Sequence, residues 1–194
     1  MNVKIDELMG RIQGLELELE AEFSKQSAEL RYGLEHGRVA FEEEILRRHR
    51  ELKTRLSRYI LNAKPLVVLT APFIYSLIVP LVLLDIFVSL YQAVCFPAYG
   101  LEKVKRSEYL VFDRGHLAYL NMLEKLNCAY CSYANGLIAY VREIAGRTEA
   151  YWCPIKHARK AIGAHEKYRD FVAFGDAQAY RKRIEELEKA AQKK

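Results

Sequence analysis

Four residues in the second half of the chain have the types and the spacing that could bind a metal ion. Cys128 and Cys131 form a C-A-Y-C pair, and Cys153 and His157 begin and end a C-P-I-K-H segment. A C-x-x-C pair on a turn directs two sulfurs at one ion, and residues four apart lie on one face of a helix. Three thiolates and one imidazole are typical of a closed structural zinc site, and they are also compatible with iron. The pattern predicts such a site, with redox-active thiols or ordinary buried thiols as alternatives.

Asp85 is the second residue that could carry chemistry. It is the only charged residue between Pro65 and Tyr99. A carboxylate inside an apolar segment indicates an ion or proton site in an oligomer. The alternative is an aspartate that reaches water where a membrane span ends. That alternative is favoured because the segment contains no second ionisable residue to bind it.

The apolar segment itself has the composition of a membrane anchor. Its 35 residues would extend about 50 Å as a helix, against a hydrocarbon core of about 30 Å. This is too long for one straight span and slightly too short for two, and Pro72, Pro80 and Pro97 can kink or break a helix. We expect either a re-entrant hairpin bent between Pro80 and Asp85, or a kinked single span. The hairpin is favoured because both flanks are basic, and basic flanks stay in the cytoplasm.

Basic residues crowd both ends of the apolar segment. Such clusters bind anionic lipid headgroups, and because no nucleic-acid motif accompanies them we expect no nucleic-acid partner. Seven precede the segment and four follow it: Arg47, Arg48, Arg50, Lys53, Arg55, Arg58 and Lys64, then Lys103, Lys105, Arg106 and Arg114.

The first third of the chain contains an eleven-residue repeat, in which steps of four and seven alternate. Eleven residues over three turns gives a stripe that runs straight or winds right-handed. It predicts one uninterrupted helix over residues 4–62, roughly 90 Å long. A stripe this narrow can be covered only by another long helix. We therefore expect the chain to associate with copies of itself, with a further protein as a possible partner at the tip of the predicted helix. Ten apolar residues form the stripe: Leu8, Ile12, Leu19, Phe23, Leu30, Leu34, Phe41, Ile45, Leu52 and Leu56.

The last part of the chain reads as a small helical domain. Helices are expected over residues 113–126, 131–145 and 154–174, and Asp176 is expected to cap a final helix. No alternation of apolar and polar residues is long enough to predict a β-strand. We therefore expect an all-α fold class. We divide the chain into a stalk (1–63), a membrane segment (64–101) and a helical Cys/His domain (102–194).

These features favour a membrane-anchored, homo-oligomeric scaffold protein with a metal-stabilised domain. Two alternatives are an oligomeric ion channel or transporter that uses Asp85, and a membrane redox protein that uses iron or thiols. No short motif of the common enzyme classes occurs, so an enzymatic activity is not indicated. Because the first ten residues contain no apolar run and no small-residue cleavage site, we expect no removable signal peptide there. Reduced thiols would place the stalk and the C-terminal domain on the cytoplasmic side of a cell membrane.

Overall fold

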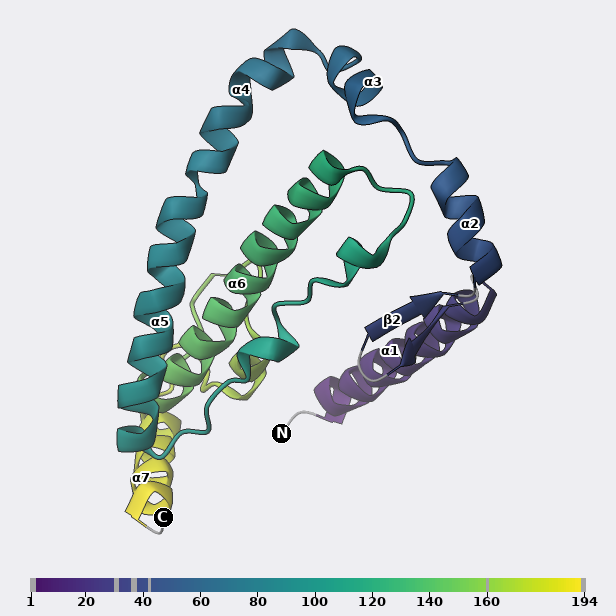
Figure 1. Cartoon of the computed structure of the whole chain (residues 1–194). Helices are drawn as coiled ribbons and strands as arrows, with labels where there is room; N and C mark the ends of the chain where they lie inside the picture. The colour runs from purple at the N-terminus through teal and green to yellow at the C-terminus, as the bar shows by residue number, and fades with distance from the viewer. Residues whose placement is uncertain (1–2, 30–31, 36–37, 42, 160, 193–194) are drawn as a thin grey trace. The chain divides into compact units, whose positions relative to one another are not determined.

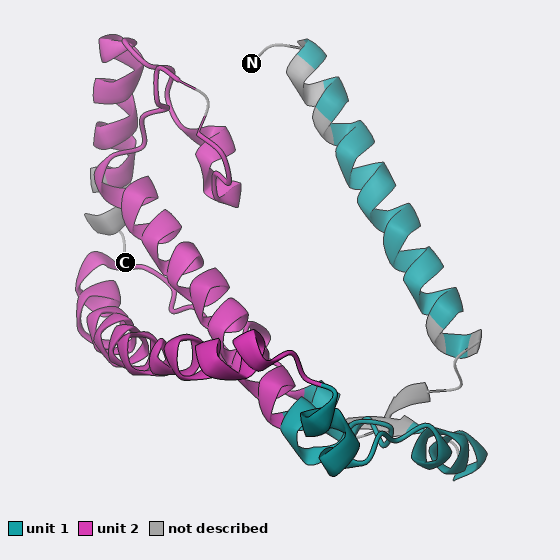
Figure 2. Cartoon of the chain, turned by 90° about the horizontal axis from the view of Figure 1, so that it is seen from above, with its two compact units in different colours: residues 1–62, 113–125 teal, residues 63–112, 126–194 magenta. Residues whose placement is uncertain are grey.

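Helices make up most of the computed structural model (Figure 1), which confirms the predicted all-α fold class. The chain divides into two compact units (Figure 2), namely residues 1–62 with 113–125 and residues 63–112 with 126–194. The structure describes all residues except 1–2, 30–31, 36–37, 42, 160 and 193–194.

The first unit does not contain the single helix predicted over residues 4–62. Its elements are α1 (Val3–Glu29), β1 (Tyr32–Glu35), β2 (Arg38–Phe41), α2 (Glu43–Glu51), α3 (Leu56–Leu61) and the 3₁₀ turn η2 (Asp113–His116).

The interruption of the predicted stalk has a local cause. β1 and β2 pair antiparallel, with Tyr32 opposite Phe41. The segment Y-G-L-E-H-G-R-V-A-F contains two glycines, which are poor helix formers, and aromatic and β-branched residues, which favour strands. Of the stripe residues in this region, Leu34 and Phe41 fall in the strands. Leu30 lies outside the described residues.

In the second unit the apolar segment forms α4 (Pro65–Ser76) and α5 (Ile78–Tyr99). Leu77 between them keeps a right-handed helical backbone (φ −63°, ψ −15°). The two helices make one stretch of 35 residues that is long and apolar enough to cross a membrane, with a mean hydropathy of 2.4 in its most apolar window of 18 residues.

The predicted hairpin is wrong, because α5 continues without reversal through Pro80 and Asp85. The kinked single helix is the alternative that agrees with the structure. Pro80 has no backbone N–H to donate to the carbonyl of Ser76, so the regular helix is interrupted one turn earlier, at Leu77. Pro80 itself lies in the first turn of α5, where a missing N–H costs little.

One continuous helix, α6 (Met122–Trp152), replaces the two helices predicted over 113–126 and 131–145. The side chain of Asn121 accepts hydrogen bonds from the backbone N–H groups of Leu123 and Glu124, both at 3.0 Å. Glu124 in turn accepts a bond from the Asn121 N–H at 2.8 Å. This reciprocal pair is a capping box, and it fixes the start of α6.

The helix predicted over residues 154–174 is absent. The described part of that segment contains the 3₁₀ turn η3 (Glu166–Asp170) and a single parallel bridge between Ile155 and Val172. Gly163 has φ +73°, a left-handed backbone that a right-handed helix cannot contain. The final helix, α7 (Ala177–Gln192), begins as predicted, because the Asp176 side chain accepts a bond from the Ala179 N–H at 2.9 Å.

The core of the second unit lies between α5, α6 and the loop that joins them, and α6 runs beside α5 (Figure 1). Gly100 (φ 68°) ends α5 and turns the chain back. A Cβ added to Gly136 would lie 2.5 Å from the carbonyl oxygen of Tyr109, so only glycine lets the loop approach α6 here. The buried core residues are Phe96, Val104, Leu110, Leu137, Tyr140 and Ile144.

Candidate functional site

Asp85 forms the centre of a polar cluster on the face of α5 that is turned toward α6. The Arg106 side chain donates two hydrogen bonds to it, from Nε to Oδ1 at 3.2 Å and from Nη2 to Oδ2 at 2.7 Å. This is the bidentate arrangement in which guanidinium and carboxylate bind most strongly. The Tyr133 hydroxyl donates to Oδ2 at 3.0 Å, and the Ser89 hydroxyl donates to Oδ1 at 3.3 Å.

The partner of Asp85 therefore comes from outside the apolar segment. Arg106 lies 21 residues further along the chain, in the loop that Gly100 turns back along α5. Sequence analysis assigned Arg106 to a lipid-binding basic cluster. That Arg106 binds Asp85 is visible only in the structure, where the loop turns back along α5. The side chain of Asp85 is 13% exposed and that of Arg106 is 49% exposed. The pair thus lies at the edge of the interface between the loop and α5, with the arginine reaching solvent.

Gln92 makes a second polar contact one to two turns further along α5. Its Nε2 donates to the Tyr140 hydroxyl at 2.9 Å and to the Val104 carbonyl at 3.3 Å. Its Oε1 accepts a bond from the Val104 N–H. All three residues of this contact are buried, and an unpaired amide there would cost about 1–3 kcal/mol. Gln92 therefore fixes both α6 and the loop to α5.

Further polar contacts join the apolar segment to α6. The Tyr91 hydroxyl lies 3.0 Å from the Thr148 hydroxyl. The Tyr130 hydroxyl donates to the Ile74 carbonyl at 2.6 Å, and the Tyr75 hydroxyl donates to the Asn127 side chain. In this region the tyrosines connect helices through their hydroxyl groups.

The cluster shifts the pKa values of two of its members. The hydrogen bond to Asp85 raises the pKa of the Arg106 guanidinium further above its usual value. Burial, and then the hydrogen bond to Asp85, raise the pKa of the Tyr133 phenol. Both shifts keep the donors in the form that binds a carboxylate. The arrangement holds a negative charge in place and is not that of a general acid or base.

The four predicted metal ligands are not brought together. Cys128 and Cys131 lie in the first turns of α6, and Cys153 and His157 follow its C-terminal end. At 1.5 Å per residue, Cys131 and Cys153 are roughly 33 Å apart along the helix axis. The predicted site required a break in the helix that would fold the two pairs together, and α6 has no break. Among the described residues there is no group of three or more His, Cys, Asp or Glu side chains that could hold a metal ion.

Zinc therefore stays a prediction, and the described residues bring together no ligand set for it. All four cysteines are free thiols. Cys131 and Cys153 are exposed, and Cys95 and Cys128 are half-buried. Elemental analysis of the purified protein remains the direct test.

Comparisons with known proteins add no relative. No family model matches the chain, and no curated protein or solved structure matches it. The chemistry of this protein therefore has to be argued from its own residues.

Proposed function

We propose that this chain is a membrane-anchored interaction protein that attaches to lipid through α4 and the outer face of α5, and that associates with copies of itself through α1. The exposed apolar surface of α4 and α5 carries the first part of the proposal. α4 has no buried residue. Its large exposed side chains are Leu66, Val67, Val68, Leu69, Phe73 and Ile74.

The outer face of α5 is apolar over a wide arc. At 100° per residue its exposed large side chains fall within about 200° of one another, opposite Asp85, Gln92 and Phe96. An apolar stripe of this width is typical of a helix that lies against lipid or another apolar surface. The residues of the arc are Val79, Val82, Leu83, Leu84, Ile86, Phe87, Leu90 and Val94.

The inner face of α5 limits how lipid can surround it. Asp85 and Gln92 bind Arg106, Tyr133, Tyr140 and the loop backbone, so protein covers this side. In the proposed arrangement, lipid covers the outer face of α5 and water covers the far face of α6. This arrangement differs from that of an isolated membrane-spanning helix, which lipid would surround on all sides.

Two matched substitutions test this arrangement in the full chain. Phe87 on α5 and Ile138 on α6 are both exposed apolar side chains, 67% and 56% respectively. We expect Phe87→Asp to reduce flotation with phosphatidylcholine vesicles strongly and Ile138→Asp to leave it unchanged. Equal losses would mean that α6 also enters the lipid. Full binding by Phe87→Asp would contradict anchoring through α5.

The second part of the proposal rests on an unpartnered stripe along α1. A narrow apolar stripe on a solvent-exposed helix is typical of a helix that pairs with another. Its exposed members within α1 are Leu8, Ile12, Leu15, Leu19 and Phe23.

Sedimentation of the full chain in detergent tests self-association. Leu19 lies on the stripe, and Leu17 is an exposed leucine on the opposite side of α1. We expect Leu19→Asp to lower the oligomer mass and Leu17→Asp to leave it unchanged. A native chain that sediments as a monomer would end this part of the proposal. The channel and redox hypotheses gain no supporting observation, since Asp85 faces Arg106 and the described cysteines form no cluster.

A further inference from the structure

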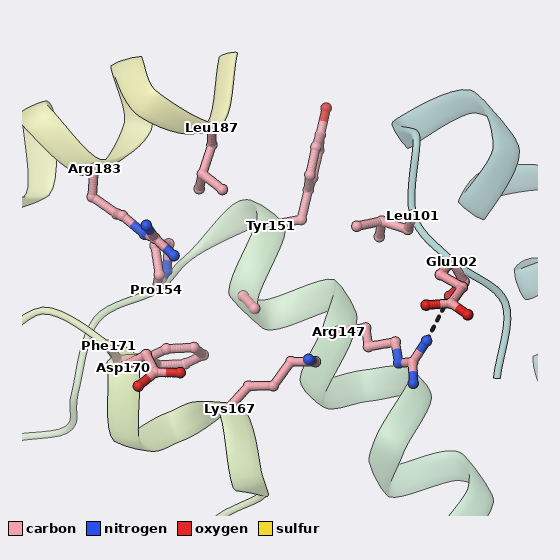
Figure 3. A pocket seen from close by; sticks show the side chains of 11 residues that line it. Leu101, Glu102, Arg147, Tyr151, Pro154, Lys167, Asp170, Phe171, Arg183 and Leu187 are labelled. Carbon is pink, nitrogen blue, oxygen red and sulfur yellow. Dashed lines mark hydrogen bonds between the residues drawn. The ribbon is translucent and has the colours of Figure 1, made fainter. Parts of the chain in front are cut away.

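A pocket of about 330 Å³ lies beyond the end of α5, between the start of the loop, the last turns of α6, η3 and α7 (Figure 3). Three cationic side chains from three different elements line it: Arg147 from α6, Lys167 from η3 and Arg183 from α7. Residues so far apart in sequence converge only because the chain folds back after α6. No feature of the proposed anchor requires them to converge.

The cations differ in how they are held. Arg147 is fixed, because its Nε donates to the Glu143 carboxylate at 2.7 Å and its Nη1 donates to the Glu102 carbonyl at 2.8 Å. Lys167 forms no ion pair with a described residue, and Figure 3 shows its amine directed toward Arg147. The Nε of Arg183 is buried and has no hydrogen-bond partner within the described chain, whereas its Nη1 lies 3.5 Å from the Glu186 carboxylate. The pocket thus presents the amine of Lys167, without an ion pair to a described residue, and one unused donor on Arg183.

Two carboxylates also line the pocket, those of Glu102 and Asp170. The carboxylates of Glu143 and Glu186, outside the lining, pair with Arg147 and Arg183, so Lys167 is the lining cation without an ion pair to a described residue. Figure 3 shows Glu102 beyond Arg147, and Asp170 beside Phe171, on either side of the Lys167 amine. Apolar walls complete the site, formed by Leu101, Tyr151, Phe171 and Leu187. A positively charged centre between apolar walls fits an anion that carries an apolar group.

An aromatic cluster adjoins the pocket at the end of α5. Tyr99 stacks on Tyr151, with ring centroids 5.2 Å apart. Trp152 meets both rings edge-on and is 56% exposed. Tyrosine and tryptophan concentrate at the level of lipid headgroups, where one side of the ring is apolar and the other is wet. With the outer face of α5 on lipid, this cluster marks the headgroup level.

We propose that this pocket binds the phosphate group of an anionic phospholipid, with Lys167 and Arg183 as its principal ligands; this rests on the membrane association proposed above. Lysine and arginine both bind phosphate oxygens, and arginine does so with two parallel hydrogen bonds. The apolar walls lie against the glycerol and the first carbons of the acyl chains. The same cations could also take free phosphate, and the experiment distinguishes the two sources.

The test uses the full chain with two double variants that remove equal charge. Lys167→Gln/Arg183→Gln changes the pocket, whereas Lys182→Gln/Lys189→Gln removes two exposed lysines of α7 outside it. Each protein is floated with vesicles of phosphatidylcholine alone and with vesicles that also contain phosphatidic acid. We expect the pocket variant to bind the anionic vesicles about tenfold more weakly than the control variant. Equal losses in both variants would overturn the proposal, since they would show general surface attraction.

Binding to vesicles of phosphatidylcholine alone tests the proposed anchor separately from the pocket. The pocket itself can also be tested without vesicles. Titration calorimetry in a neutral detergent compares inorganic phosphate with dihexanoyl phosphatidic acid. We expect the lipid to bind the native chain and to lose binding to the pocket variant. Inorganic phosphate that binds as tightly as the lipid would overturn the assignment to phospholipid. No binding of either ligand would overturn the site, even if the chain still attaches to neutral vesicles.

Discussion

α4 and α5 belong to one apolar segment, yet only α5 buries side chains against protein. α4 buries none of its residues, whereas α5 buries Gln92 and Phe96. The difference follows from where the polar side chains lie. Asp85, Ser89 and Gln92 share the arc of α5 that faces α6, while the hydroxyl of Thr70 in α4 is bonded within its own helix. Hydropathy therefore identifies the segment, and a few polar residues decide which part of it packs on protein.

The largest expected effect comes from two phenylalanines in this segment. Phe96 is fully buried and Phe73 is 75% exposed. We expect Phe96→Ala to lower the free energy of unfolding in detergent by about 3–5 kcal/mol, because it leaves a cavity in the core. Phe73→Ala should change it by less than about 0.5 kcal/mol. Denaturant titrations followed by circular dichroism measure both. Similar losses would mean that α4 is also covered by protein.

An intermediate effect is expected from the ion pair of α5. A double-mutant cycle with Asp85→Ala and Arg106→Ala should give a coupling energy of about 1 kcal/mol, at the lower end of the usual range because Arg106 is half-exposed. Thr70→Val is the matched change in α4, since it removes a hydroxyl that bonds only to the Leu66 and Val67 carbonyls. It should cost less than about 0.5 kcal/mol. A coupling energy of zero would show that the bidentate contact does not hold the loop.

The smallest effect concerns Tyr133 and high pH. Its pKa is raised in the folded chain, so the unfolded chain loses this proton first, near the usual tyrosine value of about 10. Its contribution to stability is therefore present below pH 10 and is lost as the pH rises through the raised pKa. Tyr133→Phe should lower stability at neutral pH by about 1 kcal/mol and make the decline above pH 10 shallower. An unchanged decline would assign it to other groups, such as Tyr109, whose pKa is also raised.

Sequence reasoning succeeded where one local signal decides the structure. The long apolar run predicted the helical segment, and Asp176 predicted the start of α7. It failed where a local signal was overridden or missed. The capping box of Asn121 and Glu124 is visible as N-M-L-E, and it would have placed the start of α6 correctly. The helix predicted over residues 131–145 was expected to end before Gly146, but Gly146 lies within α6, where a Cβ would meet the His165 ring at 2.7 Å.

The candidate site could be predicted only in part. Asp85 was singled out because of its charge, but its partners Arg106 and Tyr133 are 21 and 48 residues away. Contacts over such distances depend on the turn at Gly100 and on the length of α6, which no local pattern specifies. The predicted metal ligands lie apart for the same reason, since bringing them together needs a reversal of the chain that α6 does not make.

The late position of α6 in the chain affects how the protein is made. Gln92 and Tyr140 are 48 residues apart, so α5 leaves the ribosome well before its partner exists. At usual rates of synthesis this interval is roughly 2–10 s. Until the loop residues Val104 and Arg106 have emerged, the amide of Gln92 and the carboxylate of Asp85 have only water, lipid headgroups or a chaperone to bind. The order of synthesis thus favours early contact of the nascent α4 and α5 with a membrane surface, before α6 closes over the polar face.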